Sequence, residues 1–183
     1  MIIHTVNNKA DIMNSSKVKF LQETSIIEDF ISFFNQKRSI YKLHERPDPP
    51  DAVIENTFLK KYFWFEVTTV FFSKEWAIDL NSSADHNRVH KPMQQGPYVN
   101  MDDTVFQRTI KIFSEKNKKK SYDEVFSKYG KGMLVIKVYS PWGVDNNLFV
   151  SIKNAIRRKN KRTLFNRVYI YSTCGDGYTF MRC

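Results

Sequence analysis

A glutamate interrupts the most apolar stretch of this chain. From residue 63 to residue 72 nearly every side chain is aromatic, β-branched or otherwise apolar, which predicts a strand buried on both faces, and Glu66 lies in its middle. A glutamate is rarely buried unless it is paired or binds a metal ion. Because side chains alternate along a strand, Thr68 shares the face of Glu66. The chemistry open to Glu66 is therefore metal binding, ion pairing or a retained proton.

A second carboxylate precedes this strand. The proline-rich segment 47–50 cannot be helical, and Asp51 follows it at the start of a short predicted strand, residues 51–55. If the two strands pair antiparallel through residues 56–61, Asp51 comes close to Glu66. The ordinary alternatives are a turn residue for Asp51 and a buried ion pair for Glu66.

These residues resemble the motif of the PD-(D/E)xK nuclease superfamily. Pro50-Asp51 is similar to its first half and Glu66-Val67-Thr68 to its second, with Thr68 in place of the motif lysine. The resemblance implies a restriction-endonuclease-like fold and hydrolysis of phosphodiester bonds. We expect DNA in preference to RNA as the substrate, a choice that the sequence leaves open. It also implies Mg²⁺ or Mn²⁺ held by Asp51, Glu66 and the Val67 carbonyl, since such cations prefer oxygen ligands.

The missing lysine can come from another element, as it does in some members of the superfamily. The helix expected after Asp103 carries three candidates, with Lys116 preferred, Lys119 second and Lys111 third. The lysines between 116 and 120 also have an ordinary explanation, because cations near a helix C-terminus interact favourably with its dipole.

Glu45 and Glu28 are candidates for an additional acidic ligand, which the resemblance allows. Each also has an ordinary explanation. Glu28 completes a predicted capping box with Ser25, which would begin a helix there, and Glu45 can be a surface residue of a strand.

The chain is strongly basic, with 29 Lys and Arg against 19 Asp and Glu and a formal net charge of +10. This charge favours a polyanionic partner. A region without acidic residues near the C-terminus carries the residues predicted to contact nucleic acid: Lys153, Arg157, Arg158, Lys159, Lys161 and Arg162. The alternative is a helix face whose charges are merely solvated.

Periodicity predicts one α/β domain, a mixed central sheet flanked by helices, spanning residues 23–183 after an N-terminal arm, partly disordered, at residues 1–22. The predicted order is a helix, three strands, a helix, a strand, a helix and a strand, with a closing hairpin. The predicted bounds are 25–38 for the first helix; 40–44, 51–55 and 63–72 for the strands; a helical turn at 73–80; a helix capped by Asp102 or Asp103; a strand at 133–139; a helix containing Leu148 to Ile156; and a strand at 167–171.

The sequence has no apolar run long enough to span a membrane and no secretory pattern, so we expect a cytoplasmic protein without a membrane partner. Two cysteines are too few for a disulfide framework. Three functions are open. The first is a metal-dependent endonuclease, and the second is a binding module on the same fold that holds nucleic acid or a protein without cleavage. The third is a protein-interaction or structural protein whose basic face meets an acidic partner. A homodimer is one open oligomeric state.

Overall fold

The computed structural model describes residues 8–84, 89–93, 100–140, 143–159, 163–174 and 177–183. Its elements, in chain order, are α1 (Asn8–Asn35), β1 (Tyr41–Glu45), β2 (Ala52–Asn56), β3 (Lys61–Phe71), α2 (Lys74–Ala84), α3 (Met101–Lys116), the short 3₁₀ helix η1 (Lys120–Tyr122), α4 (Asp123–Tyr129), β4 (Gly132–Tyr139), α5 (Asn146–Lys159), β5 (Phe165–Cys174) and β6 (Gly177–Arg182).

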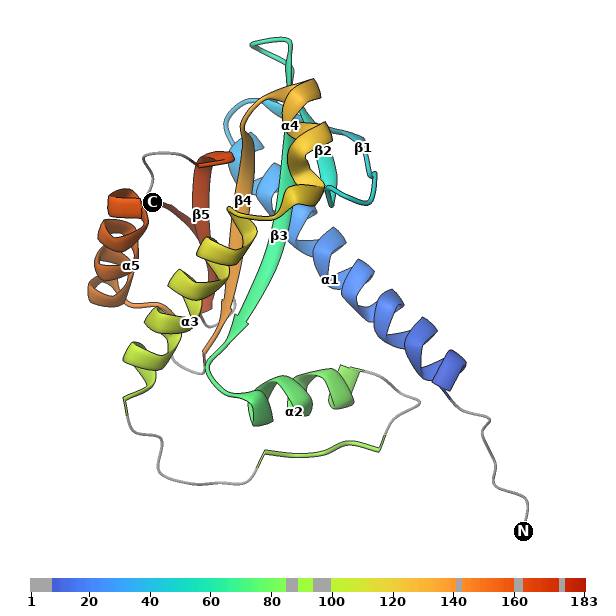
Figure 1. Ribbon diagram of the computed structural model, residues 1–183, viewed down its shortest axis with the longest axis vertical. Coiled ribbons are helices and arrows are strands. Elements are labelled where there is room, and N and C mark those ends of the chain that lie inside the picture. Colours follow the sequence, from blue (N-terminus) through green and yellow to red (C-terminus); the bar gives the residue numbers. More distant parts are fainter. Residues whose placement is uncertain (1–7, 85–88, 94–99, 141–142, 160–162, 175–176) are drawn as a thin grey trace.

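The six strands form one mixed sheet in the order β1-β2-β3-β4-β5-β6. The first three strands are antiparallel neighbours, β3, β4 and β5 run parallel, and β6 returns antiparallel to β5. Helices cover both faces (Figure 1). The predicted single α/β domain, with a mixed sheet flanked by helices, is confirmed.

The two faces of the sheet bury separate apolar clusters. On one face α1 contributes Ile26, Ile27 and Phe30, and the Phe30 ring lies 4.8 Å from the ring of Phe65 on β3. On the other face α3 and α5 cover β3, β4 and β5, with Trp64 among the fully buried side chains. Alternation along β3 therefore sends Trp64, Glu66 and Val70 toward α3, as the sequence predicts.

Helix α1 begins well before the predicted capping box. It runs from Asn8 to Asn35, so Ser25 lies inside the helix and the prediction that Ser25 begins it is wrong. The helix also passes through residues 22 and 23, where the sequence places the boundary between arm and domain. Its described side chains up to Ser25 are exposed or half-buried. This part of the helix thus carries no apolar periodicity that could have revealed it.

The start of α3 also differs from expectation. The residue before the helix is Asn100, with a left-handed φ of 55° and no capping hydrogen bond from its side chain. Asp102 and Asp103 lie within the first turn, where their charges favour the helix dipole without capping the helix. The short helix α4 was not predicted, because its seven residues are too few to show a clear period. Among the described residues, none of the helices has both the length and the apolar character of a membrane span.

Candidate functional site

The candidate site lies where strand β3 loses one of its neighbours. Strand β2 begins at Ala52, which pairs with Phe65 of β3, whereas β3 continues to Phe71. Proline cannot donate to a ladder, so the segment 47–50 stops β2 at this point. Within the described parts of the chain, the later residues of β3 pair with a strand on one side only, where β4 lies. We call the other side of residues 66–71 the free edge of β3.

Asp51 lies at the beginning of this free edge. Its Oδ2 atom accepts a hydrogen bond of 2.7 Å from the backbone N–H of Val67. Since the N–H and C=O groups of one strand residue point to the same edge, the Val67 carbonyl faces the same side as Asp51. The loop is held from α1, because Arg46 donates to the Asp51 carbonyl at 3.2 Å and to the hydroxyl of Thr24.

Glu66 is almost completely buried, with 3% of its surface exposed, and faces α3. Its Oε1 atom lies 2.5 Å from Nζ of Lys116, which reaches it from the last turn of α3. The Lys116 side chain is 21% exposed, so the pair lies at the boundary between core and solvent. Thr68 lines a pocket of about 100 Å³ together with Lys116. The structure thus brings Asp51, Glu66, Thr68 and Lys116 into one region.

The electrostatics of this region are unfavourable to a second negative charge. Burial, followed by the charge of Glu66, raises the pKa of Asp51 to about 7, although the Val67 N–H and the Lys116 ammonium act in the opposite direction. Burial and the neighbouring Glu66 carboxylate also raise the pKa of Tyr122. The Tyr122 hydroxyl is buried beside Glu66. A cation near both carboxylates would relieve the repulsion between them.

Two residues near the site were missed by the sequence analysis. Glu23 lines the same pocket as Thr68 and Lys116, and its charge also raises the pKa of Asp51. It precedes the buried Ile26 by three residues, and residues three apart lie on the same side of a helix. A predicted helix extended back through Ser25 would therefore have placed Glu23 toward the sheet. Tyr122 gave no signal, because it belongs to the short η1 segment.

The two acidic candidates from the sequence lie elsewhere. Glu28 is exposed on α1. Glu45 is exposed on β1, and its Oε1 atom accepts a 2.9 Å hydrogen bond from the hydroxyl of Tyr129. Among the residues that the structure describes, Glu23 rather than either of these is the third carboxylate beside Asp51 and Glu66.

The other candidate lysines have different surroundings from Lys116. Nζ of Lys119 lies 4.9 Å from the centre of the Tyr122 ring. Lys111 is exposed and lies 4.0 Å from Glu115, one helical turn away. Neither has the ion pair with Glu66 that places Lys116 at the site.

The predicted nucleic-acid contacts map mainly to the outer side of α5. Arg157, Arg158 and Lys159 are exposed, whereas Lys153 is half-buried with its Nζ 5.5 Å from the Phe149 ring centre. Lys159 donates a 3.3 Å hydrogen bond to Ser114 on α3. The remaining two predicted contacts, Lys161 and Arg162, lie outside the described residues.

Few groups at this site are available as ligands for a metal ion. No group of three or more His, Cys, Asp and Glu side chains is arranged to hold a metal within the described parts of the chain. Asp51, Glu66 and the Val67 carbonyl nevertheless supply hard oxygen donors. Burial and then the charge of Glu66 raise the pKa of Asp51, although Lys116 already compensates part of the charge of Glu66. Oxygen donors of this kind are the ones that Mg²⁺ and Mn²⁺ prefer.

Comparison with models of protein families, with characterised proteins and with solved structures finds no match to this chain. The interpretation of the site therefore rests on its geometry and its electrostatics.

The raised pKa of Asp51 predicts how stability depends on pH. Between pH 3.8, its ordinary pKa, and about 7, the folded protein holds a proton that the unfolded chain releases, so the free energy of unfolding falls as pH rises through this window. Asp51→Asn keeps an acceptor for the Val67 N–H and removes this titration. In EDTA, urea unfolding across the window should show a flatter pH profile for Asp51→Asn, which should also gain stability over the wild type toward neutral pH. Asp48→Asn, at an exposed position, should follow the wild type, and an unchanged slope in Asp51→Asn would contradict the account.

The Glu66–Lys116 pair predicts strong energetic coupling. Lys116→Met leaves a buried carboxylate without its cation and should lower the free energy of unfolding by about 3 kcal/mol. Glu66→Gln in the same chain should recover part of this loss, giving a coupling energy of about 2 kcal/mol in a double-mutant cycle. The matched control is the exposed pair Lys111–Glu115, for which the same cycle should give about 0.5 kcal/mol or less. Equal coupling in both pairs would show that Glu66 is not held by Lys116.

Proposed function

We propose that this protein is a metal-dependent nuclease that hydrolyses phosphodiester bonds, in DNA rather than RNA, on a restriction-endonuclease-like fold. The observation that carries the proposal is the meeting of Asp51, Glu66 and Lys116 at the free edge of β3. The order of the elements, a helix, three antiparallel strands and a helical crossover to a parallel strand, also supports it.

Asp51, Glu66 and the Val67 carbonyl would hold the Mg²⁺ or Mn²⁺ ion. When bound, such an ion polarises the phosphoryl group and lowers the pKa of a coordinated water. The role of the protein is to hold these oxygen atoms close together. The Val67 N–H fixes one carboxylate, and burial of Glu66 on the α3 side fixes the other.

Lys116 takes the place of the motif lysine in this proposal. Its ammonium group approaches Glu66 from α3. The motif position itself, on the same face of β3 as Glu66, holds the uncharged Thr68. An ammonium group there can orient an attacking water and compensate negative charge that develops on the phosphate in the transition state. Thr68 lines the same pocket and can donate a hydrogen bond, but it contributes no charge.

The net charge of +10 supports a nucleic-acid substrate, because cations that neutralise phosphates release counterions from the strand. On α5 the exposed Arg157, Arg158 and Lys159 provide three such cations. These residues would act in binding rather than in the reaction.

The Lys116–Glu66 ion pair also favours a second candidate, a nucleic-acid-binding or protein-interaction module on the same fold without activity. The pair compensates the charge of Glu66 without any metal, so it would be stable in a protein that does not cleave. Thr68 at the motif position favours the same alternative. A cleavage assay separates the two candidates.

The nuclease proposal predicts cleavage of plasmid or oligonucleotide DNA that requires Mg²⁺ or Mn²⁺ and stops with EDTA. Asp51→Asn and Glu66→Gln should abolish cleavage while DNA binding persists. Lys116→Met should lower turnover by roughly 100-fold with little change in binding, as expected for a charge used mainly in the transition state.

The matched control is Lys118→Met, which removes an exposed lysine two residues away. It should cleave like the wild type. Full turnover in Lys116→Met would refute its proposed role, and a wild-type protein that binds DNA but leaves it intact with every divalent metal would establish the binding module instead.

A further inference from the structure

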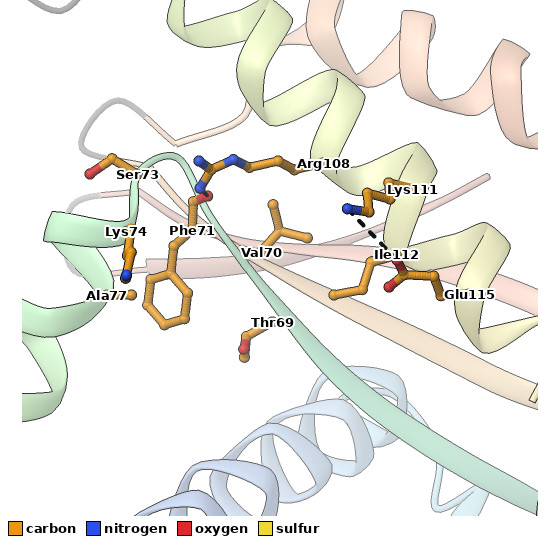
Figure 2. Close-up of a pocket in the computed structure, with 10 residues that line it drawn as sticks. All are labelled: Thr69, Val70, Phe71, Ser73, Lys74, Ala77, Arg108, Lys111, Ile112 and Glu115. Carbon is orange, nitrogen blue, oxygen red and sulfur yellow. Dashed lines mark hydrogen bonds and ion pairs between the residues drawn. The ribbon is translucent and has the colours of Figure 1, made fainter.

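A second, larger pocket lies farther along the free edge of β3. It has a volume of about 370 Å³ and is bounded by β3, α2 and α3 (Figure 2). Its lining residues are Thr69, Val70, Phe71, Ser73, Lys74, Ala77, Arg108, Lys111, Ile112 and Glu115. Thr69 also lines the pocket that contains Glu23, Thr68 and Lys116, so the two pockets adjoin along the strand. The size lies within the range of small-ligand sites in proteins.

The rim of this larger pocket is basic. Arg108 and Lys111 extend from α3 and Lys74 from α2, whereas Glu115 is the single acidic residue of the lining. Arg108 donates a 2.8 Å hydrogen bond to the Phe71 carbonyl, which positions its guanidinium beside the free edge. A guanidinium has five N–H donors, so others stay available to an anion.

The rest of the lining is largely apolar. Val70, Phe71, Ala77 and Ile112 provide the aliphatic and aromatic part of the lining. The Phe71 ring is itself held in place, since it stacks on Tyr139 with the ring centres 4.8 Å apart and the planes 5° from parallel. A flat apolar group with an attached anion matches this combination, and a nucleotide has both.

The two pockets are close enough for one strand of nucleic acid to reach both. Four residue steps separate Val67 from Phe71 on β3, a span of about 13 Å. Stacked nucleotides rise about 3.4 Å each. A strand of about five nucleotides therefore extends from the carboxylates at Asp51 to the basic rim at Arg108.

We propose that the pocket between β3, α2 and α3 binds one nucleotide of a single-stranded segment of the substrate, with the base against Phe71 and Ala77 and a phosphate at Lys74 and Arg108. The inference rests on the proposed nuclease function, because a phosphate of the same strand, about four nucleotides away, is the one that Asp51 and Glu66 would address. It makes an unpaired strand or a frayed end, rather than an intact duplex, the form of nucleic acid that fits this groove.

The test measures binding by fluorescence anisotropy of a labelled single strand of about eight nucleotides, in EDTA so that the proposed reaction cannot run. The double variant Lys74→Ala/Arg108→Ala should bind about tenfold or more weakly, and the slope of log affinity against log salt should become shallower by about 0.7 for each phosphate that is no longer neutralised. Ala77→Phe fills the pocket without changing charge, so it should weaken binding and leave the salt slope unchanged.

The control variant Lys37→Ala/Arg38→Ala removes the same number of charges near the C-terminal end of α1. These residues are exposed and follow the helix, whose last residue, Asn35, lies roughly 24 Å along the axis from Lys19 at the smaller pocket. This control should retain the affinity of the wild type within about twofold. A decrease as large as that of the pocket variant would overturn the inference, because bulk charge alone would then explain binding.

Three further results bear on the inference. If a free nucleoside monophosphate displaces the strand at a concentration equal to the strand's own dissociation constant, the pocket takes a free nucleotide and the inference is wrong. If binding depends on the pocket but no metal supports cleavage, the nucleotide site stands and the nuclease proposal fails. If the protein cleaves DNA while Ala77→Phe and the double variant bind normally, the nuclease proposal stands and this inference fails.

Discussion

The late start of strand β2 is the constraint on which the site depends. Prolines at 47, 49 and 50 remove the donors that a longer β2 would need, so the strand pairs with β3 only as far as Phe65. The backbone of Val67 then needs another partner, and Asp51 supplies it. A continuous β2 would cover this edge and satisfy Val67 with backbone groups. The site exists because a carboxylate, rather than a strand, completes the hydrogen bonding of β3 at this position.

Burial of charge is the second consequence of this arrangement. Glu66 faces a core of aromatic and aliphatic side chains that includes Trp64, and Lys116 is its charged partner there. Asp51, close to Glu66 and largely removed from water, has a pKa near neutrality. Such a pair of carboxylates is costly to a fold that gains nothing from it. A cation that binds both carboxylates would relieve their repulsion, and the free energy regained would contribute to the binding affinity for the cation. This is the physical argument for a function at the site.

The sequence predicted the parts of this arrangement that depend on alternation and on proline. The apolar run around Glu66 has a clear strand pattern, and the strand that carries Glu66 is adjacent in the chain to the strand that Asp51 immediately precedes, so their pairing follows directly. The sequence did not reveal Glu23, because the described part of α1 before Ile26 has no buried apolar residue that would extend the helical period back to it. Nor could it reveal the pocket at Arg108, since that depends on how α2 and α3 pack against the end of β3.

The most direct test of the account is whether a divalent ion binds between Asp51 and Glu66. Crystals of the wild-type protein soaked in Mn²⁺ should show an anomalous difference peak at about 2.0 to 2.6 Å from a carboxylate oxygen of each residue and from the Val67 carbonyl oxygen. The same soak of Asp51→Asn should lose the peak. If saturating Mn²⁺ gives no peak at this position and the Lys116–Glu66 pair is unchanged, the two carboxylates do not form a metal site and the central claim is contradicted.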